Sequence, residues 1–322
     1  MHTVADVGED ALLAQVFPIL PEGRATLLGP GDDAAVLAAP DGRVVVSTDV
    51  LVEGRHFRLD RGTPEALGRR AAAQNLADVA AMGARPTALV VGLVVPTSTP
   101  VDWVLGLARG LAAACAPHGV GVVGGDLTAG EEVVVAVTVH GDLEGREAVR
   151  RSGARPGDVV ALAGTLGRSA AGLALLEAGR AAGEWAGLVA THFAPEPPLE
   201  AGPAAAEAGA RAMLDLSDGL LRDAGRVARA SGVTIDLASA RLERWCAPLE
   251  PAARALGADP WEWVLAGGED HGLLASFPQG VPLPEGFAVV GEVREGAGEV
   301  LVDGRPPRGS TGWDHFAAQP RR

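Results

Sequence analysis

Aspartates beside small residues recur at five places in this 322-residue chain, and they are the side chains best suited to chemistry. The clusters are Gly31-Asp32-Asp33, Ser47-Thr48-Asp49, Asn75 to Asp78, Gly124-Gly125-Asp126 and Asp215 to Gly219. Carboxylate oxygens are hard ligands of the kind that Mg²⁺ prefers, and Mg²⁺ in proteins is commonly completed by water and substrate phosphates. The clusters therefore predict a site where Mg²⁺ joins acidic side chains to a phosphate.

Predicted elements would bring these acids together. Residues 43–48 read as a strand that ends at Asp49, a strand at 119–123 ends shortly before Asp126, and Asp215 lies near the end of a strand at 213–216. Ligand residues in α/β proteins often gather at strand ends. Taken singly, each acid could equally be a turn former or a helix cap. The recurrence of the pattern is what favours a site.

Composition limits how phosphate could be bound. All 27 basic residues are arginine, so a P-loop NTPase, a protein kinase and a pyridoxal-phosphate enzyme are excluded, because each needs a lysine. The net charge of −14 argues against nucleic acid or an anionic membrane as a partner. Carboxylates and phosphates can share a site only with divalent cations between them.

Two glycine-rich segments could bind a nucleotide or phosphate by their spacing alone. Gly119-x-Gly121-x-x-Gly124 fits a dinucleotide-binding pattern, but it falls within a predicted strand and is not followed by a helix, so we reject it. Gly164 to Gly167 lies between a strand and a helix, where backbone N–H groups could meet a phosphate. No supporting residues accompany that loop.

The chain alternates strand and helix signals in two halves, which predicts an α/β (α+β two-domain) fold with domains at 1–147 and 148–322. Expected helices are 64–82, 101–116, one ending at 178, 203–211 and 220–230; expected strands beyond those above are 87–95, 133–140, 158–163, 233–237, 271–277, 287–293 and 299–302. The absence of a signal sequence or long apolar run, with only Cys115 and Cys246, points to the cytoplasm rather than a membrane.

The clusters, in this order, resemble the thiamine-monophosphate kinase family of the aminoimidazole ribonucleotide synthetase superfamily. The closest motifs are STDVLVEGRHF at 47–57 and GGED at 267–270, supported by WDHF at 313–316. GDDAA within GPGDDAAVL at 29–37 and GGD within GGDLT at 124–128 occur across the superfamily. The other matching segments are NLADVAAMGARP at 75–86, RSGARPGD at 151–158 and DLSDGL at 215–220.

The resemblance implies an N-terminal mixed-sheet domain that binds ATP and Mg²⁺ and pairs in a homodimer, and a C-terminal α/β domain that completes the nucleotide and substrate site. It implies direct in-line transfer from ATP to thiamine monophosphate, giving thiamine diphosphate and ADP, with several Mg²⁺ ions. Asp49, Asp126 and Asp218 fall on catalytic positions. The implied Mg²⁺ positions are Asp33, Ser47, Thr48 (the last two through hydroxyl or carbonyl oxygens), Asp49, Asp78, Asp126, Asp215 and Asp218. ATP positions are Gly125, Asp126, Arg151 and Ser217; substrate positions are His56, Glu269 and Trp313.

Two residues depart from the family pattern, which usually has tyrosine where this chain has His271 and Trp313. Trp313 keeps a flat face for stacking on the substrate's ring, whereas the role of His271 stays open. His56 has an alternative reading as a polar residue at a strand end.

Other functions fit part of the pattern. The nearest rival is another activity of the superfamily, namely aminoimidazole ribonucleotide synthesis, hydrogenase-maturation dehydration or selenophosphate synthesis. The last normally needs a reactive cysteine or selenocysteine near the N-terminus, and this sequence has no cysteine before Cys115. A cation- or nucleotide-binding protein without turnover, and a structural protein with solvated acidic loops, are rivals of a different class.

Overall fold

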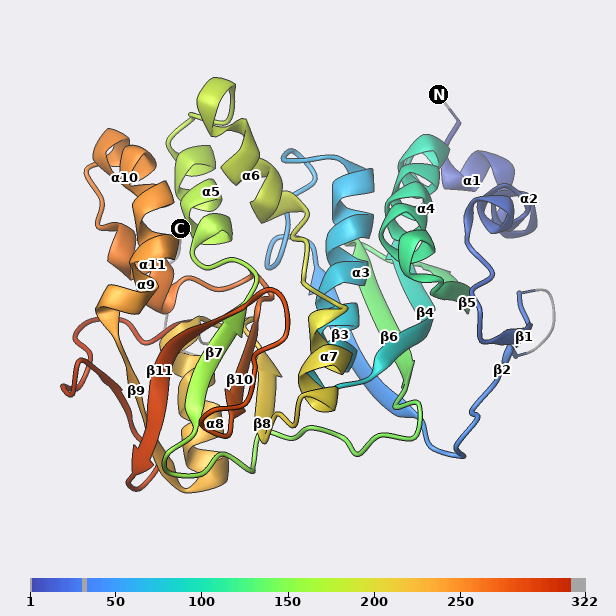
Figure 1. The fold of residues 1–322 in the computed structure, drawn as a ribbon. Helices are drawn as coiled ribbons and strands as arrows, with labels where there is room; N and C mark the ends of the chain where they lie inside the picture. Colours follow the sequence, from blue (N-terminus) through green and yellow to red (C-terminus); the bar gives the residue numbers. More distant parts are fainter. Residues whose placement is uncertain (1, 31–33, 314–322) are drawn as a thin grey trace. The chain divides into compact units, whose positions relative to one another are not determined.

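The computed structural model describes residues 2–30 and 34–313, and the chain divides into two compact units, residues 1–148 and 149–322 (Figure 1). We call them unit 1 and unit 2. The division lies one residue from the boundary expected from the sequence.

Unit 1 is built on a four-stranded mixed sheet with the order β3-β6-β4-β5, beside a separate β1-β2 pair. Strand β6 is antiparallel to both β3 and β4, and β4 is parallel to β5. The strands are β1 (Thr26–Leu28), β2 (Val36–Leu37), β3 (Val45–Val52), β4 (Arg85–Val95), β5 (Gly121–Ala129) and β6 (Val134–Asp142); the helices are α1 (Val4–Val7), α2 (Glu9–Val16), α3 (Pro64–Ala81), α4 (Val101–Cys115), η1 (Phe17–Ile19) and η2 (Ala116–His118).

Helices α3 and α4 lie side by side in unit 1 because glycines allow a very close approach (Figure 1). A Cβ atom on Gly110 would lie 2.0 Å from the carbonyl oxygen of Glu65, and one on Gly68 would lie 2.2 Å from that of Leu107. Helix α3 begins where the Thr63 hydroxyl accepts a hydrogen bond from the N–H of Ala66 (3.1 Å), with Pro64 in its first turn. Thr63 and Pro64 thus determine where α3 begins, and Gly68 and Gly110 determine where it contacts α4.

The two faces of the unit 1 sheet differ. On β6, Val135, Val137 and Val139 are buried and alternate with half-buried residues, so one face is packed. On the other face, Val46 and Val50 of β3 are 61% and 45% exposed. The sheet therefore has a packed face that carries α3 and a second face on which Val46 and Val50 are exposed.

Unit 2 contains a six-stranded sheet with the order β12-β9-β11-β7-β10-β8, in which only the β12–β9 pair is parallel. The strands are β7 (Val159–Ala163), β8 (Ala212–Asp215), β9 (Val233–Leu237), β10 (Leu273–Phe277), β11 (Phe287–Glu295) and β12 (Val300–Val302). The helices are α5 (Arg168–Glu177), α6 (Ala186–Phe193), α7 (Ala201–Glu207), α8 (Leu220–Ser231), α9 (Ser239–Cys246), α10 (Glu250–Leu256), α11 (Pro260–Ala266), η3 (Gly183–Trp185) and η4 (Ala247–Leu249). Every residue of β8, β9 and β10 is buried, so both faces of this sheet are covered.

Most long elements match the sequence expectations, and the expected strand at 233–237 is confirmed without change. Helices α3, α4 and α8 end within one residue of the predicted bounds. The sequence reading missed the short helices α6, α9, α10 and α11, whose stability depends on packing more than on pattern. It also ended β3 and β5 too early, which matters for the site.

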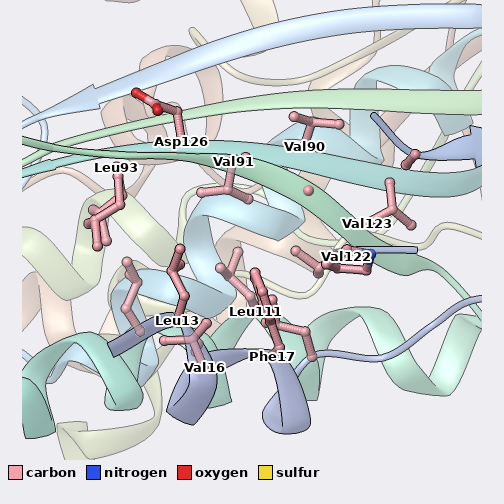
Figure 2. Close-up of a pocket in the computed structure, with 18 of the residues that line it drawn as sticks. Leu13, Val16, Phe17, Val90, Val91, Leu93, Leu111, Val122, Val123 and Asp126 are labelled. Atoms are coloured by element: carbon pink, nitrogen blue, oxygen red, sulfur yellow. The ribbon is translucent and has the colours of Figure 1, made fainter. Parts of the chain in front are cut away.

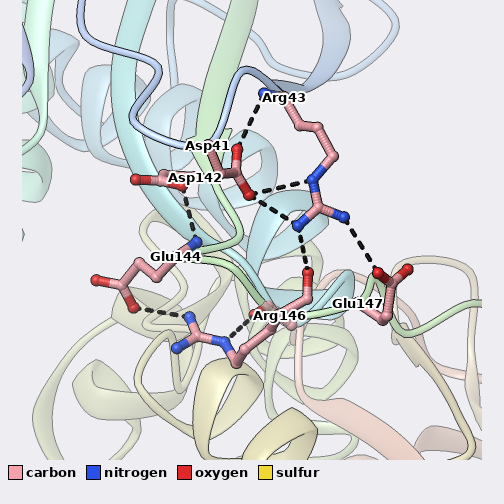
Figure 3. A network of polar contacts seen from close by, with 7 residues as sticks. Asp41, Arg43, Asp142, Glu144, Arg146 and Glu147 are labelled. Atoms are coloured by element: carbon pink, nitrogen blue, oxygen red, sulfur yellow. Dashed lines mark hydrogen bonds and ion pairs between the residues drawn. The ribbon is translucent and has the colours of Figure 1, made fainter.

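Charged residues fix the end of unit 1 (Figure 3). The guanidinium of Arg43 bonds to the Asp41 carboxylate (2.8 Å) and to the carbonyl oxygen of Arg146 (2.9 Å), while Arg146 pairs with Glu144 (2.8 Å). Glu147 completes the network at 3.4 Å but is almost fully exposed. Exposed ion pairs contribute little each, so we expect this network to order the chain before the boundary more than to stabilise it.

Neither cysteine forms a disulfide: Cys115 and Cys246 are both free and buried. Burial raises the pKa of the Cys115 thiol to about 12. Across the described residues, no helix combines the length and apolar character needed to cross a bilayer.

Candidate active site

The Ser47-Thr48-Asp49 cluster lies inside β3, not after it. The strand continues to Val52 because residues 50–52 still pair with β6, so the prediction that Asp49 ends the strand was wrong. Side chains alternate along a strand, and Ser47 shares its face with Asp49. Thr48 points to the opposite face, where its hydroxyl donates to the carbonyl oxygen of Val137 (2.9 Å).

Ser47 connects β3 to α3. Its hydroxyl donates a 2.7 Å hydrogen bond to the Asp78 carboxylate, so these two expected Mg²⁺ positions are adjacent. Asn75, one helical turn earlier, is fully buried, and its amide donates to the carbonyl oxygen of Ala71 (2.9 Å). Its carbonyl oxygen Oδ1 has no hydrogen-bond partner among the described residues.

Asp126 also lies within a strand, because β5 runs on to Ala129 and does not end near residue 123 as predicted. It pairs with Gly92 of β4, and Figure 2 shows its carboxylate on the Val90 side of the sheet, away from Val91 and Leu93. Asp49 of β3 and Val91 of β4 both pair with Val137 of β6, so the side chains of Asp49 and Val91 lie on the same face of the sheet. The carboxylates of Asp49 and Asp126 therefore leave opposite faces. The shared strand-end location expected for the two acids is therefore incorrect.

Gly125 and Asp126 line a pocket of about 520 Å³ between the sheet and helices α2 and α4 (Figure 2). Gly125 has no room for a side chain, since a Cβ atom there would lie 1.9 Å from the carbonyl oxygen of Val91. The walls are mainly apolar and include Leu13, Val16, Phe17, Leu93, Leu111 and Val123. Asp33 lies outside the described residues, although Pro30 and Ala34 on either side of its segment also line this pocket.

His56 is held in the turn that follows β3. The ring nitrogen Nδ1 of His56 accepts a 2.9 Å hydrogen bond from the backbone N–H of Val52. The backbone N–H of His56 donates to the carbonyl oxygen of Val52 (2.9 Å). Because Nδ1 is the acceptor, the ring proton lies on Nε2. The residue can therefore offer an Nε2–H donor from a fixed ring.

Three segments that the sequence singled out meet in unit 2. The N–H of Glu269 donates to the carbonyl oxygen of Ser217 (2.9 Å), and the N–H of Trp313 donates to that of Asp218 (2.9 Å). Glu269 has a positive φ of 69°, which is uncommon outside glycine and is often found at functional sites. The segment from Asp215 to Asp218 thus carries expected metal, nucleotide and substrate positions in one hydrogen-bonded assembly.

Arginines neutralise Asp218, and the sequence analysis missed them. Arg226 forms an ion pair with the Asp218 carboxylate, and Arg222 lies 3.8 Å from it. Asp223 is fully buried, accepts from the N–H groups of Asp218 (2.9 Å) and Gly219 (3.1 Å), and pairs with Arg226. Burial raises the pKa of the Asp223 carboxyl to about 7, although Arg226 opposes the shift. The spacing of Asp218, Arg222 and Arg226 at four-residue intervals could have revealed this row.

Two further expectations can be compared with the structure. Asp270 occupies the N-terminus of α5, where its carboxylate accepts from the N–H groups of Arg168 and Ser169 (3.2 Å each), so the loop at Gly164 to Gly167 does not present these groups to a phosphate. Arg151 is exposed, and its carbonyl oxygen accepts from the Ser231 hydroxyl (3.1 Å).

The donor chemistry fits Mg²⁺, since carboxylate and hydroxyl oxygens such as those of Asp78 and Ser47 are ligands it accepts. Within the part of the chain that the structure describes, no three His, Cys, Asp or Glu side chains lie close enough together to hold a metal ion. The candidate ligands lie in both units, and those of unit 1 are divided between the two faces of its sheet.

Comparison with known proteins identifies both units. Residues 31–143 match the family model described as AIR synthase related protein, N-terminal domain, and residues 155–303 match its C-terminal domain. A thiamine-monophosphate kinase of Mycobacterium tuberculosis is 49% identical over 98% of this chain and 93% of its own length, and one of Corynebacterium glutamicum is 43% identical over 98% and 95%.

Solved structures agree. A thiamine monophosphate kinase from Aquifex aeolicus superposes with a TM-score of 0.74 at 34% identity, covering 82% of this chain and 89% of its own. A structure described as AaThiL complexed with AMPPCP and TMP gives a TM-score of 0.77 at 32% identity, covering 98% and 99%. A hydrogenase maturation protein, HypE, shares the fold at 19% identity. The chain belongs to the thiamine-monophosphate kinase family of AIR synthase-related proteins.

Proposed function

We propose that this enzyme transfers the terminal phosphoryl group of ATP directly to thiamine monophosphate, in the cytoplasm, giving thiamine diphosphate and ADP. Relatives named for this activity match nearly the whole chain. The observation from the structure that carries the proposal is the unit 2 assembly, in which the segment from Asp215 to Asp218 is hydrogen-bonded to both Glu269 and Trp313. Candidate metal, nucleotide and substrate positions are thereby joined by backbone hydrogen bonds.

The unit 1 pocket supports binding of a nucleoside. Its volume of about 520 Å³ and apolar walls fall in the usual range for small-molecule sites. Asp126 is among the lining residues, and its carboxylate leaves the sheet on the Val90 side, away from the walls at Val91 and Leu93, where it could bind a metal ion next to phosphates. Ser217 and Arg151 are the proposed ATP contacts in unit 2.

Each unit, taken by itself, contributes proposed oxygen ligands for Mg²⁺. In unit 1 these are Asp33, Ser47, Thr48, Asp49, Asp78 and Asp126; in unit 2 they are Asp215 and Asp218. When bound, the ions supply the charge neutralisation that phosphates next to carboxylates require. Asp218 carries its own counter-charge in Arg226, so a metal there would have to share the carboxylate or displace the guanidinium.

The acceptor sets what the protein must do. A phosphate monoester has a second pKa of about 6, so it is largely ionised at neutral pH and needs no general base. The remaining task is to align two polyanions and stabilise the charge on the transferring group. His56 can donate from Nε2 and Glu269 can accept, while the half-exposed Trp313 offers an aromatic face to the substrate's ring.

We also propose a homodimer formed through the open face of the unit 1 sheet. Val46 and Val50 expose apolar surface there, and Val44 beside them is 53% exposed. Contiguous exposed apolar surface is characteristic of interfaces. Light scattering should give twice the mass of the chain, and Val46→Glu should give the monomer mass.

The test of the activity is ADP release measured with thiamine monophosphate and with thiamine, each with and without Mg²⁺. We expect release only with thiamine monophosphate and Mg²⁺. Equal release with thiamine, or release in EDTA, would contradict the assignment.

A further inference from the structure

His271 and Asp215 form a buried side-chain pair in unit 2. Nδ1 of His271 lies 3.0 Å from Oδ2 of Asp215, and the two residues are 3% and 4% exposed. Asp215 is the last residue of β8 and pairs with Leu273, the first residue of β10. Two neighbouring strands therefore bring the pair together.

The chemistry of the pair assigns the proton. An ionised carboxylate can only accept hydrogen bonds, so Nδ1 of His271 must carry the hydrogen that is shared with Oδ2. The terminal torsion of an aspartate is broad and has no sharp preference of its own. A buried donor at one oxygen therefore selects one orientation of the Asp215 carboxylate.

The backbone of His271 holds the same segment. Its N–H donates to the carbonyl oxygen of Leu216 (3.1 Å), the residue that follows Asp215. His271 has a positive φ of 51°, a conformation in which histidine is found more often than most residues. Side chain and backbone thus act together on Asp215 and its neighbour, in a backbone conformation that has an energetic cost.

We propose that His271 is the positioning residue for Asp215, and that it holds the carboxylate in the orientation needed to bind a divalent cation. The inference rests on the proposed function, because it takes Asp215 as a metal ligand. Partners of this kind commonly change metal affinity by about 10- to 100-fold when they are lost. A tyrosine, usual at this position in the family pattern, carries its oxygen at the far end of the ring and could not make the same bond.

Mn²⁺ provides a probe that does not require turnover. We would titrate Mn²⁺ into the full chain with the non-hydrolysable ATP analogue AMPPCP and follow free Mn²⁺ by electron paramagnetic resonance. His271→Phe keeps a ring without the donor, and His271→Asn keeps a donor near the Nδ1 position and tolerates positive φ. We expect Phe to weaken Mn²⁺ binding by about 10- to 100-fold and Asn to remain close to wild type.

Unchanged Mn²⁺ affinity in His271→Phe, or an equal loss in His271→Asn, would overturn the inference. Melting temperatures identify a variant that does not fold. If His271→Phe does not fold, His271→Gly is used in its place, because glycine removes the donor and accepts a positive φ without strain. The two proposals fail separately. A wild-type chain that binds Mn²⁺ and AMPPCP but releases no ADP with thiamine monophosphate refutes the activity, whereas active enzyme with normal Mn²⁺ affinity in the Phe variant refutes only the role of His271.

Discussion

The two units present their acidic residues in different ways. In unit 1, Asp49 and Asp126 lie inside regular strands, and Asp78 lies on a helix beside the neutral hydroxyl of Ser47. In unit 2, Asp215 and Asp218 lie at the end of a strand and in a loop, with His271 and Arg226 as partners. The partners of these acids therefore differ: Asp78 of unit 1 has a neutral hydroxyl, whereas Asp215 and Asp218 of unit 2 have a histidine and an arginine.

This difference predicts what each unit contributes. A cation is what allows a carboxylate and a phosphate to share a site, so replacing Asp49 or Asp126 of unit 1 should act mainly on metal-dependent catalysis. Acids that already have basic partners stabilise the fold as well, so changes in unit 2 should affect stability more.

The largest effect is expected from Asp49→Asn and Asp126→Asn. Each removes a charged ligand but keeps the shape of the side chain, so kcat should fall by roughly 10²- to 10³-fold or more with little change in melting temperature. Steady-state kinetics at saturating Mg²⁺ and thermal unfolding measure both quantities. Near-normal kcat in either variant would remove the proposed metal role.

The next effect concerns unit 2 and Asp223→Ala. This variant leaves Arg226 with one fewer partner and the N–H groups of Asp218 and Gly219 without their acceptor. Loss of a buried charged partner should lower the free energy of unfolding by about 3 kcal/mol. Denaturant unfolding measures it, and Asp223→Asn serves as the control that keeps an acceptor. A loss below about 0.5 kcal/mol, the size of an ordinary surface change, would contradict the contrast.

A smaller effect separates the two faces of β3. Ser47→Ala removes the hydroxyl that contacts Asp78 and should lower the affinity for Mg²⁺ by about tenfold, as loss of one charge-assisted hydrogen bond would. Thr48→Val changes a side chain on the opposite face and keeps the backbone carbonyl through which Thr48 would bind metal. It should therefore alter the affinity for Mg²⁺ by about twofold at most. Magnesium titrations of activity compare the two. The reverse order would place the metal on the Thr48 face.

The smallest effect concerns Cys115. Since burial raises its pKa from the ordinary 9.0 to about 12, the folded chain retains the proton while the unfolded chain loses it above pH 9. Stability should therefore fall as pH rises above 9, and Cys115→Ser should reduce this slope. Unfolding at pH 8 and pH 10 tests the sign, and a wild-type slope no steeper than that of the variant would contradict it.

The sequence predicted the long elements well because their signals are local. Helix α3 carries Thr63, Pro64 and Gly83 at its ends, and β9 follows a glycine and alternates apolar with polar residues. The ends of β3 and β5 were missed because pairing with neighbouring strands extends them through polar residues. Such pairing is a tertiary effect that no local window contains.

The candidate site was predicted by residue type more than by geometry. The clusters singled out Asp215 to Asp218 and the family resemblance added Glu269, whose backbone N–H donates to the carbonyl oxygen of Ser217. Arg226 and Asp223 were missed because their role depends on which face of α8 meets the loop. That the acids of β3 and β5 leave opposite faces also depends on strand register, which spacing alone does not give.

The most direct test of the account is the binding of AMPPCP to the full chain by calorimetry, with Mg²⁺ and with EDTA. If acidic side chains bind the nucleotide only through cations, the affinity should fall by at least about 100-fold without Mg²⁺, as expected when like charges meet unscreened. Asp126→Asn should bind the analogue less tightly than wild type with Mg²⁺. Equal affinity with and without Mg²⁺ would contradict the central claim.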